Sequence, residues 1–351
     1  MPDTPRHDPA ALIAFATALC EAAGLDADKA GAVARTLVES DLLGHVTHGL
    51  ALLPKYLDDL EAGTMRKEGG PEVVRDLGAC VTWNGRRLPG AWLVHRALDL
   101  ALERVGTYGT VTIAIGDSHH IGCLAAYLTR ATDAGCMLVL NSSAPGAKAV
   151  APHGARQAVL SPDPVAAGFP TGGDPVMLDV SASITTINMA NTLLRQGRRY
   201  PAPWLQDTEG NPSDDPAVLS AGGSLLPAGG FDHGQKGYAW ALMNEALTQG
   251  LSGYGRADAP KGQTASVLLQ LIDPNAFAGI DAFTRQTGHT AAACRAATPR
   301  PGIAKVRLPG ESGLAHRRDA VAQGLRLAPG ILAALEGPAG KLGVAMPQAQ
   351  G

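Results

Sequence analysis

The sequence carries little charge, and this excludes several classes of partner. Charged residues make up 17% of its 351 residues, and the formal net charge is −3. Proteins that bind nucleic acid or acidic membrane surfaces usually present a concentrated basic patch, which this composition does not provide. No run reaches the roughly 18 consecutive apolar residues that a membrane-spanning helix needs. We therefore expect neither nucleic acid nor a membrane as a partner.

Cysteines are also few. The chain has five, an odd number, and no two of them are spaced as C-x-x-C. A secreted disulfide framework normally has an even number of cysteines at short spacings. The opening segment MPDTPRHDPA is polar and lacks the apolar core of a secretory signal. We therefore expect reduced, mostly buried thiols in a cytoplasmic protein.

Two glycine-rich nucleotide-binding motifs are missing as well. No G-x-G-x-x-G follows a predicted strand, and G-x-x-x-x-G-K-[ST] does not occur. If the protein binds a dinucleotide, it does so without the Rossmann fingerprint.

Both ends of the chain have helical patterns. Apolar residues recur at helical spacing in residues 8–25, 26–45 and 50–63, and Pro54 is tolerable near the first turn of the third segment. Residues 315–344 return to a helical pattern. We expect a helical N-terminal part, residues 1–70, and a C-terminal part, residues 286–351, that returns to helix.

The middle of the chain alternates strands and helices. Strands are predicted at 110–115, 136–141, 176–183 and 265–273, a strand pair at 71–85 with Asn84-Gly85 as its turn, and helices at 91–106 and 123–135. This predicts an α/β domain over residues 71–285. Residues 198–235 are rich in Pro, Gly and Asp and predict a long ordered loop, a kind of segment that often carries function.

Polar side chains gather at the junctions between these segments. His45 and His48 lie three residues apart with Thr47 between them. They could be metal ligands, although no carboxylate or cysteine that would complete a zinc site is close in sequence. His48 could instead be an acid/base group, with Thr47 and a distant carboxylate forming a relay. A structural role for both histidines is a third interpretation.

Two further junctions could supply the rest of a site. His119 and His120 lie in a strand-to-helix loop, which suits an anion or a reacting carbonyl, although surface histidines would look the same. Asp179 follows three apolar residues, and burial of its carboxylate is costly without a partner such as His48. A strand-end cap is the alternative for Asp179.

Two basic segments could bind a phosphate. Lys236 lies in a glycine-rich loop before an apolar helix, a plausible phosphate or carboxylate cradle. Arg307, Arg317 and Arg318 cluster with His316 around a Pro-Gly turn, where arginine favours phosphate but a solvated helix start is also possible. Together these clusters favour a small-molecule enzyme over a scaffold.

The order of these segments resembles the malate/L-lactate dehydrogenase family. The segments are GHVTHGLALLPKY, SHHIGCLAAYL, SPDPVAAGFP, VMLDVSAS, LLPAGGFDHGQKGYAWALMNEAL and VRLPGE. The resemblance covers nearly the whole chain and implies NAD(P)-dependent oxidoreductases with a non-Rossmann α/β fold. It also implies a central α/β sandwich, a helical domain formed by both chain ends, and homodimers with the site between domains and subunits.

The resemblance implies roles for individual residues. His48 matches the acid/base histidine, Thr47 the hydroxyl before it, Asp179 the relay carboxylate, and His120 the proton acceptor of some members. The residues matched to cofactor contacts are His119, His120, Ile121, Gly122, Cys123, Lys236, Arg307, Gly310, Glu311 and Arg317. Those matched to the substrate side are Leu52, Ser161, Val180 and Ser181.

Two positions depart from the family pattern. Leu52 stands where many members have an arginine suited to clamping a substrate carboxylate, and Asp163 stands where they have asparagine. Either another cation replaces that arginine, or the substrate lacks a carboxylate at that point.

The predicted function is hydride transfer between NAD or NADP and a 2-hydroxy/2-oxo acid or a related small carbonyl compound, with His48 as acid/base. The alternatives are an imine reductase acting on a cyclic imino acid and a noncatalytic dinucleotide-binding homologue. A metal-dependent hydrolase built on His45, His48 and His120 is a further one, although we expect no resident metal. The choice between NADH and NADPH stays open at this point.

Overall fold

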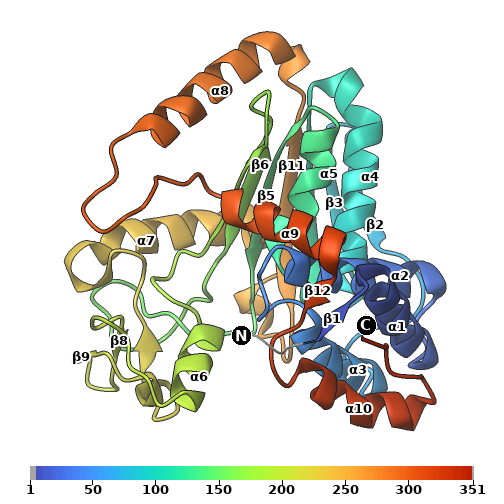
Figure 1. Ribbon diagram of the computed structural model, residues 1–351, viewed down its shortest axis with the longest axis vertical. Helices are drawn as coiled ribbons and strands as arrows, with labels where there is room; N and C mark the ends of the chain where they lie inside the picture. Colours follow the sequence, from blue (N-terminus) through green and yellow to red (C-terminus); the bar gives the residue numbers. More distant parts are fainter. Residues whose placement is uncertain (1–4, 350–351) are drawn as a thin grey trace.

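The computed structural model describes residues 5–349. Its centre is a seven-stranded mixed sheet with the strand order β2-β3-β4-β11-β5-β6-β7 (Figure 1). β3 and β4 are parallel, and the other neighbours in this sheet are antiparallel. The strands are β2 (Glu72–Asp76), β3 (Cys80–Asn84), β4 (Thr110–Ser118), β5 (Met137–Ser143), β6 (Val165–Phe169), β7 (Val176–Val180) and β11 (Ala265–Ile272).

Helices cover both faces of this sheet. Side chains alternate between the faces along a strand, so Val267, Leu269 and Leu271 of β11 enter the main hydrophobic cluster. On that face lie α4 (Gly90–Tyr108) and α5 (Leu128–Asp133), and on the other lie α7 (Gly230–Glu245) and the π-helical turn Ala246–Gly250 (Figure 1). The result is an α/β sandwich.

The two chain ends build a second hydrophobic cluster. It is enclosed by α1 (Pro9–Ala22), α2 (Ala27–Leu42), α3 (Leu53–Glu61) and α10 (Ile331–Leu342). Pro54 lies in the first turn of α3, where its missing N–H costs nothing. The strand β1 (Arg6–His7) pairs with β12 (Leu325–Arg326), and α10 lies beside α3 (Figure 1). The expected α/β class, with a helical part formed by both ends, is confirmed.

The segment 198–235 is not a simple loop, so that expectation is wrong. It contains β8 (Leu205–Gln206), β9 (Pro212–Ser213) and β10 (Ser224–Leu225), which form a small sheet, and it reaches into α7. Strands of two residues are too short to show a period in the sequence. This sheet and α6 (Ile187–Arg195) share a third hydrophobic cluster.

Other differences are local. The turn of the first hairpin is at residues 77–79, with Gly78 at φ +80°, and not at Asn84-Gly85, where β3 ends. The predicted helix at 123–135 begins as the 3-10 helix Leu124–Tyr127. The predicted boundary between residues 285 and 286 falls inside α8 (Ile280–Ala296), and α9 (Glu311–Gln323) packs on α2.

The composition predicted unpaired thiols and no membrane-spanning helix. All five cysteines lie in the described part of the chain and none forms a disulfide; Cys20, Cys123 and Cys136 are buried, whereas Cys80 and Cys294 are exposed. Among residues 5–349, no helix is both long and apolar enough to cross a membrane.

The packing of α10 on the N-terminal helices yields a prediction. Leu335 is fully buried in the second cluster, so Leu335→Ala should lower the free energy of unfolding by about 2–5 kcal/mol. Leu77 is 66% exposed, and Leu77→Ala should change it by less than about 0.5 kcal/mol. Urea denaturation of both variants measures the difference, and equal effects would contradict the docking of α10.

Candidate active site

A cavity of about 380 Å³ lies where the helical part meets the central sheet. Its walls come from residues 45–48, from 120–124, from the ends of β5 and β7, and from the start of α6. It adjoins a groove of about 770 Å³ that runs along β7 to residues 298–313. His45 and Asp179 line both hollows, so the two form one elongated site.

The loop that carries His48 is fixed by a buried carboxyl group. Asp41, at the end of α2, accepts a hydrogen bond from the Leu50 N–H at 2.8 Å. A Cβ on Gly49 would lie 2.2 Å from Asp41, so only glycine allows this approach. Gly44 turns the chain out of α2 at φ +81°. The GHVTHG segment therefore has one defined path, and Thr47 and His48 line the cavity.

His48 has the surroundings of an acid/base group. Its Nδ1 lies 3.0 Å from the Thr47 hydroxyl. Burial lowers the pKa of His48, the charge of Asp179 opposes that shift, and His45 adds to it. With Nδ1 protonated and donating to Thr47, Nε2 is left as the basic nitrogen.

Asp179 acts on His48 through charge and not through a hydrogen bond. Its Oδ2 accepts the Ala125 N–H at 2.9 Å and the Cys123 thiol at 3.5 Å. No hydrogen bond joins Asp179 to His48 in the described part of the chain. The expected hydrogen-bonded relay is therefore absent there, whereas the electrostatic coupling is present.

His120 is held as a neutral hydrogen-bond donor. The Tyr56 hydroxyl donates to its Nδ1 at 2.7 Å, and the Gly122 N–H points to the same atom at 3.4 Å. Since Nδ1 accepts, the proton of the neutral ring is on Nε2. Burial, followed by the charges of His48 and His119, lowers the pKa of His120 to about 3. This favours donation to a substrate oxygen over proton transfer. Tyr56 gave no signal in the sequence.

His119 has a different place. It is buried, its Nε2 lies 3.2 Å from Asp59, and it does not line the cavity. Burial lowers the pKa of His119 to about 4, against the charge of Asp59. The geometry gives His119 a structural role beneath the loop.

The other residues matched to the cofactor are divided among several places. Ile121, Gly122 and Cys123 line the cavity. Arg307 and Gly310 line the groove, and Glu311 braces its wall by accepting the Leu308 N–H at 3.3 Å and pairing with Lys305.

Lys236 and Arg317 lie outside both hollows. Lys236 is exposed on α7. Arg317 pairs with Glu39 at 2.6 Å and lines a separate hollow over α2 and α4. Arg318 pairs with Asp174 at 3.0 Å. None of these three residues lines the cavity or the groove.

The residues matched to the substrate side are also separated. Ser161 and Ser181 line the cavity, and Val180 lines the groove. Leu52 packs against the second hydrophobic cluster and does not line the cavity. Among residues 5–349, no lysine or arginine lines this cavity. The first residues of α6, Thr186 to Asn188, lie at its wall instead.

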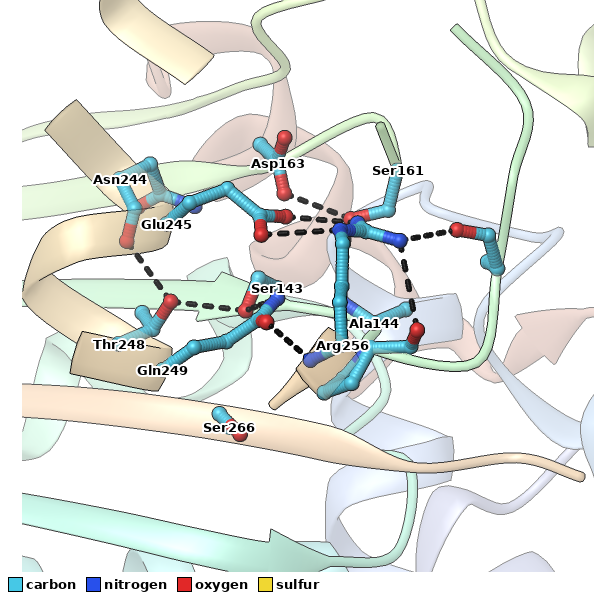
Figure 2. Close-up of polar contacts among 12 residues, drawn as sticks. Ser143, Ala144, Ser161, Asp163, Asn244, Glu245, Thr248, Gln249, Arg256 and Ser266 are labelled. Carbon is cyan, nitrogen blue, oxygen red and sulfur yellow. Dashed lines mark hydrogen bonds and ion pairs between the residues drawn. The ribbon is translucent and has the colours of Figure 1, made fainter. Parts of the chain in front are cut away.

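A buried polar network supports the wall beside Ser161 (Figure 2). The Ser161 hydroxyl donates to Asp163 Oδ1 at 2.6 Å and accepts the Ala144 N–H at 3.0 Å. Arg256 makes a bidentate pair with Glu245, at 2.9 and 2.6 Å. Burial, followed by the charge of Glu245, raises the pKa of Asp163 to about 8, so its carboxyl group stays protonated at neutral pH.

The network also ties the end of β5 to α7. Asn141 donates to Asn244 at 2.8 Å. The Ser143 and Thr248 hydroxyls lie 2.7 Å apart (Figure 2). Arg256 reaches the carbonyls of Pro145 and Ala147. In the sequence, the only local sign of this network is that the apolar run MLVL ends in the polar residues Asn141, Ser142 and Ser143.

Asp41 gives a prediction about pH. Burial raises its pKa to about 7, whereas the unfolded chain releases that proton near pH 3.9. The folded protein thus holds an extra proton between these values, and its free energy of unfolding falls as pH rises through that window. From pH 5 to pH 8, the free energy of unfolding of Asp41→Asn should therefore rise by about 2–3 kcal/mol relative to that of wild type.

The measurement is urea denaturation at both pH values. Asp58→Asn is the control, because Asp58 is exposed on the neighbouring α3. If Asp41→Asn and wild type show the same slope with pH, Asp41 ionises normally in the folded protein.

The Arg256–Glu245 pair gives a second prediction. Its side chains are 21% and 15% exposed, so Arg256→Met leaves a largely buried carboxylate unpaired and should cost about 3 kcal/mol of unfolding free energy. Adding Glu245→Gln to Arg256→Met should restore part of the lost unfolding free energy, because it removes the unpaired charge. Arg318→Met, which breaks an exposed pair, should cost less than about 1 kcal/mol. Similar losses for both arginines in chemical denaturation would show that the network adds no stability.

Comparisons with known proteins identify the family of the chain. The model of the malate/L-lactate dehydrogenase family matches residues 8–336. The chain is 33% identical to an L-lactate dehydrogenase of Cupriavidus necator over 92% of this chain and 94% of that one. The malate dehydrogenase structure from Pyrococcus horikoshii has a TM-score of 0.89 at 23% identity, over 99% and 98% of the two chains.

A second solved structure points the same way. The Δ1-piperideine-2-carboxylate reductase from Pseudomonas syringae has a TM-score of 0.84 at 25% identity, over 95% of this chain and all of that one. The resemblance seen in the sequence is confirmed: the chain belongs to the malate/L-lactate dehydrogenase family and is a dehydrogenase of that family.

Proposed function

We propose that the protein transfers a hydride between NAD or NADP and a small 2-hydroxy/2-oxo acid or related carbonyl compound, with His48 as acid/base. The observation that carries this proposal is the state of His48. It lines the cavity on a fixed loop, it is coupled to Asp179 through charge, and Thr47 fixes its Nδ1.

The shape of the site fits a dinucleotide. The cavity and the groove share His45 and Asp179, so a long ligand with two ends can occupy both. The nicotinamide end would lie in the cavity against residues 121–123, and the other end in the groove near Arg307 and Gly310. When bound, the nicotinamide supplies or accepts the hydride. Lys236 and Arg317 are not part of this proposed binding surface, in contrast to what the resemblance implies.

His48 would move the proton that accompanies the hydride. In the oxidative direction, its neutral Nε2 accepts the proton of the substrate hydroxyl. The imidazolium that forms is stabilised by the charge of Asp179, the same interaction that opposes the lowering of its pKa. In the reductive direction, His48 returns this proton to the carbonyl oxygen. The Nε2–H of His120 would polarise that oxygen without itself changing protonation.

A substrate carboxylate would have to be bound without a cation from this cavity. The start of α6 offers the replacement, since unpaired N–H groups and the dipole at a helix N-terminus favour anions. Thr186 caps this helix, and the Asn188 side chain lies at the cavity wall. We propose that these groups bind the carboxylate in place of the arginine that Leu52 replaces.

We also propose a homodimer, in the cytoplasm. Exposed apolar side chains on α6, α7 and the turn after it support an interface: Ile187, Met189, Leu194, Leu242, Met243 and Leu251. Apolar surface of this kind often marks a partner contact. The five unpaired cysteines fit a reducing compartment.

Imine reduction is the second candidate. The similarity to the piperideine-2-carboxylate reductase favours it, and a cavity without lysine or arginine would not repel a cyclic iminium ion. His48 could serve the same role, since protonation of the imine nitrogen makes its carbon a better hydride acceptor. A noncatalytic dinucleotide-binding homologue would bind the cofactor but turn nothing over.

The test combines binding with turnover. NADH and NADPH are titrated into wild type, His48→Ala and the control His289→Ala, a substitution of an exposed histidine on α8, with nicotinamide fluorescence as the signal. We expect one cofactor to bind all three proteins. A panel of 2-oxo acids, neutral ketones and cyclic imines should then be reduced 10²–10⁴-fold more slowly by His48→Ala, the range for loss of a general acid/base.

The pH profile tests the same role. For oxidation, kcat/KM should rise with pH and level off above the pKa of His48, which burial places below 6.5. Turnover by His48→Ala at the wild-type rate would refute the acid/base role. Binding without turnover on the whole panel would favour the noncatalytic homologue, and absence of binding by either cofactor would refute the proposed function.

A further inference from the structure

Three metal-binding side chains meet where the cavity opens into the groove. Ligand atoms of His45, Cys123 and Asp179 all lie within 4.8 Å of one another. In the sequence, His45 is a possible metal ligand with no cysteine or carboxylate close to it, because Cys123 and Asp179 lie far along the chain. The fold brings them together: His45 follows α2, Cys123 precedes the 3-10 helix Leu124–Tyr127, and Asp179 is in β7.

The distance between the sulfur of Cys123 and the nearer carboxylate oxygen of Asp179 has the value expected in a zinc site. Zinc bonds are about 2.3 Å to a thiolate and about 2.0 Å to a carboxylate oxygen, so tetrahedral angles place the sulfur and the oxygen roughly 3.5 Å apart. In the structure, Cys123 Sγ and Asp179 Oδ2 are 3.5 Å apart. His45 lies within 4.8 Å of both atoms, so its imidazole needs to move by at most about 1.5 Å to become the third ligand, since the nitrogen-to-sulfur and nitrogen-to-oxygen separations in such a site are roughly 3.6 and 3.3 Å.

The charges of the three ligands also suit a divalent cation. Without metal, the Cys123 thiol donates its proton to Asp179, and the Ala125 N–H holds the carboxylate in place. Binding of the cation forms a sulfur–metal bond and releases the thiol proton to solvent. One thiolate, one carboxylate and one neutral imidazole then balance the two positive charges.

We propose that His45, Cys123 and Asp179 form a binding site for a thiophilic divalent cation of the Zn²⁺ class, with water as its fourth ligand. His48 is not among the ligands, so this is not the hydrolase centre built on His45, His48 and His120. The cation would be an inhibitor, because the residues that hold it line the junction through which the dinucleotide must run. Metal binding itself does not depend on the proposed function; only this exclusion rests on it.

The test uses Co²⁺ as a spectroscopic probe on the full chain. A thiolate bound to Co²⁺ gives a charge-transfer band in the near ultraviolet. We expect wild type to show this band at one equivalent of Co²⁺, and Zn²⁺ to abolish it. Cys123→Ser should lose the band, and His45→Asn should bind Co²⁺ more than about 100-fold more weakly, because even groups outside the ligand set contribute 10–100-fold.

The exposed cysteines provide the matched control. The double variant Cys80→Ser/Cys294→Ser removes the thiols most open to metal and should keep the band in full. Loss of the band in this variant would assign it to surface cysteines and overturn the proposal. Absence of the band in wild type, or its persistence in Cys123→Ser, would overturn it equally. If Cys123→Ser does not fold, the Co²⁺ affinity of His45→Asn is the deciding measurement, and an unchanged affinity would overturn the proposal.

Competition is measured separately. Zn²⁺ at ten times its dissociation constant should weaken dinucleotide binding about 11-fold in wild type, as mass action requires for mutually exclusive ligands. In Cys123→Ser, the ratio of affinities with and without Zn²⁺ should be near one. Simultaneous binding of both would refute the exclusion. Failure of the dinucleotide to bind at all would instead refute the proposed function while the cobalt spectra still report on the metal site.

Discussion

The position of His48 depends on one buried carboxyl group. Asp41 holds the Leu50 N–H, and the chain can pass so close to it because residue 49 has no side chain. Both contacts act on the segment between α2 and α3, on which Thr47 and His48 lie. Burial raises the pKa of this carboxyl to about 7, so below neutral pH it supports the loop as an uncharged group. The acid/base group thus has a rigid support, and the opposite charge that acts on it is that of Asp179.

The site separates charged from neutral groups. Its wall beside Ser161 rests on a network that contains Glu245 and Arg256. The polar side chains that line the cavity are imidazoles, hydroxyls, a thiol, one carboxylate and Asn188 at the start of α6. Because Glu245 and Arg256 pair with each other outside the cavity, they hold the wall residues in place and have little effect on the protonation of a bound ligand. Asp179 is the exception, and its charge falls on His48 and on the thiol of Cys123.

Much of the fold followed from the sequence because its signals are local. The apolar period and the capping residue Asp8 define α1, and β-branched runs define β4 and β11. The small sheet β10-β8-β9 was missed because its strands have two residues each. Periodicity carries no information at that length.

The site was predictable to a lesser degree. His48, Asp179 and residues 121–123 were predicted to be site residues from their motifs, and all of them line the cavity. This succeeded because each motif lies next to the end of a strand or helix that the sequence also predicts. The distances between the side chains of the site, and their hydrogen-bonding partners, were not predictable from the sequence. Neither the contact of Asp179 with Cys123, nor the contact of Tyr56 with His120, nor the pairing of Arg317 with Glu39 has a local signature. Each joins segments that meet only in the folded chain.

The pairing of β1 with β12 has a consequence for biosynthesis. Arg6 pairs with Arg326, and the helices α1, α2 and α3 share their core with α10. Ribosomes add about 5–20 residues per second. Roughly 15–60 s therefore pass between the synthesis of α3 and that of α10, which covers the apolar faces of the first helices. During that interval the emerging chain exposes an incomplete core, which is the condition under which chaperones bind and nascent chains aggregate. The helical part can therefore be completed only after the segment that carries α10 has left the ribosome.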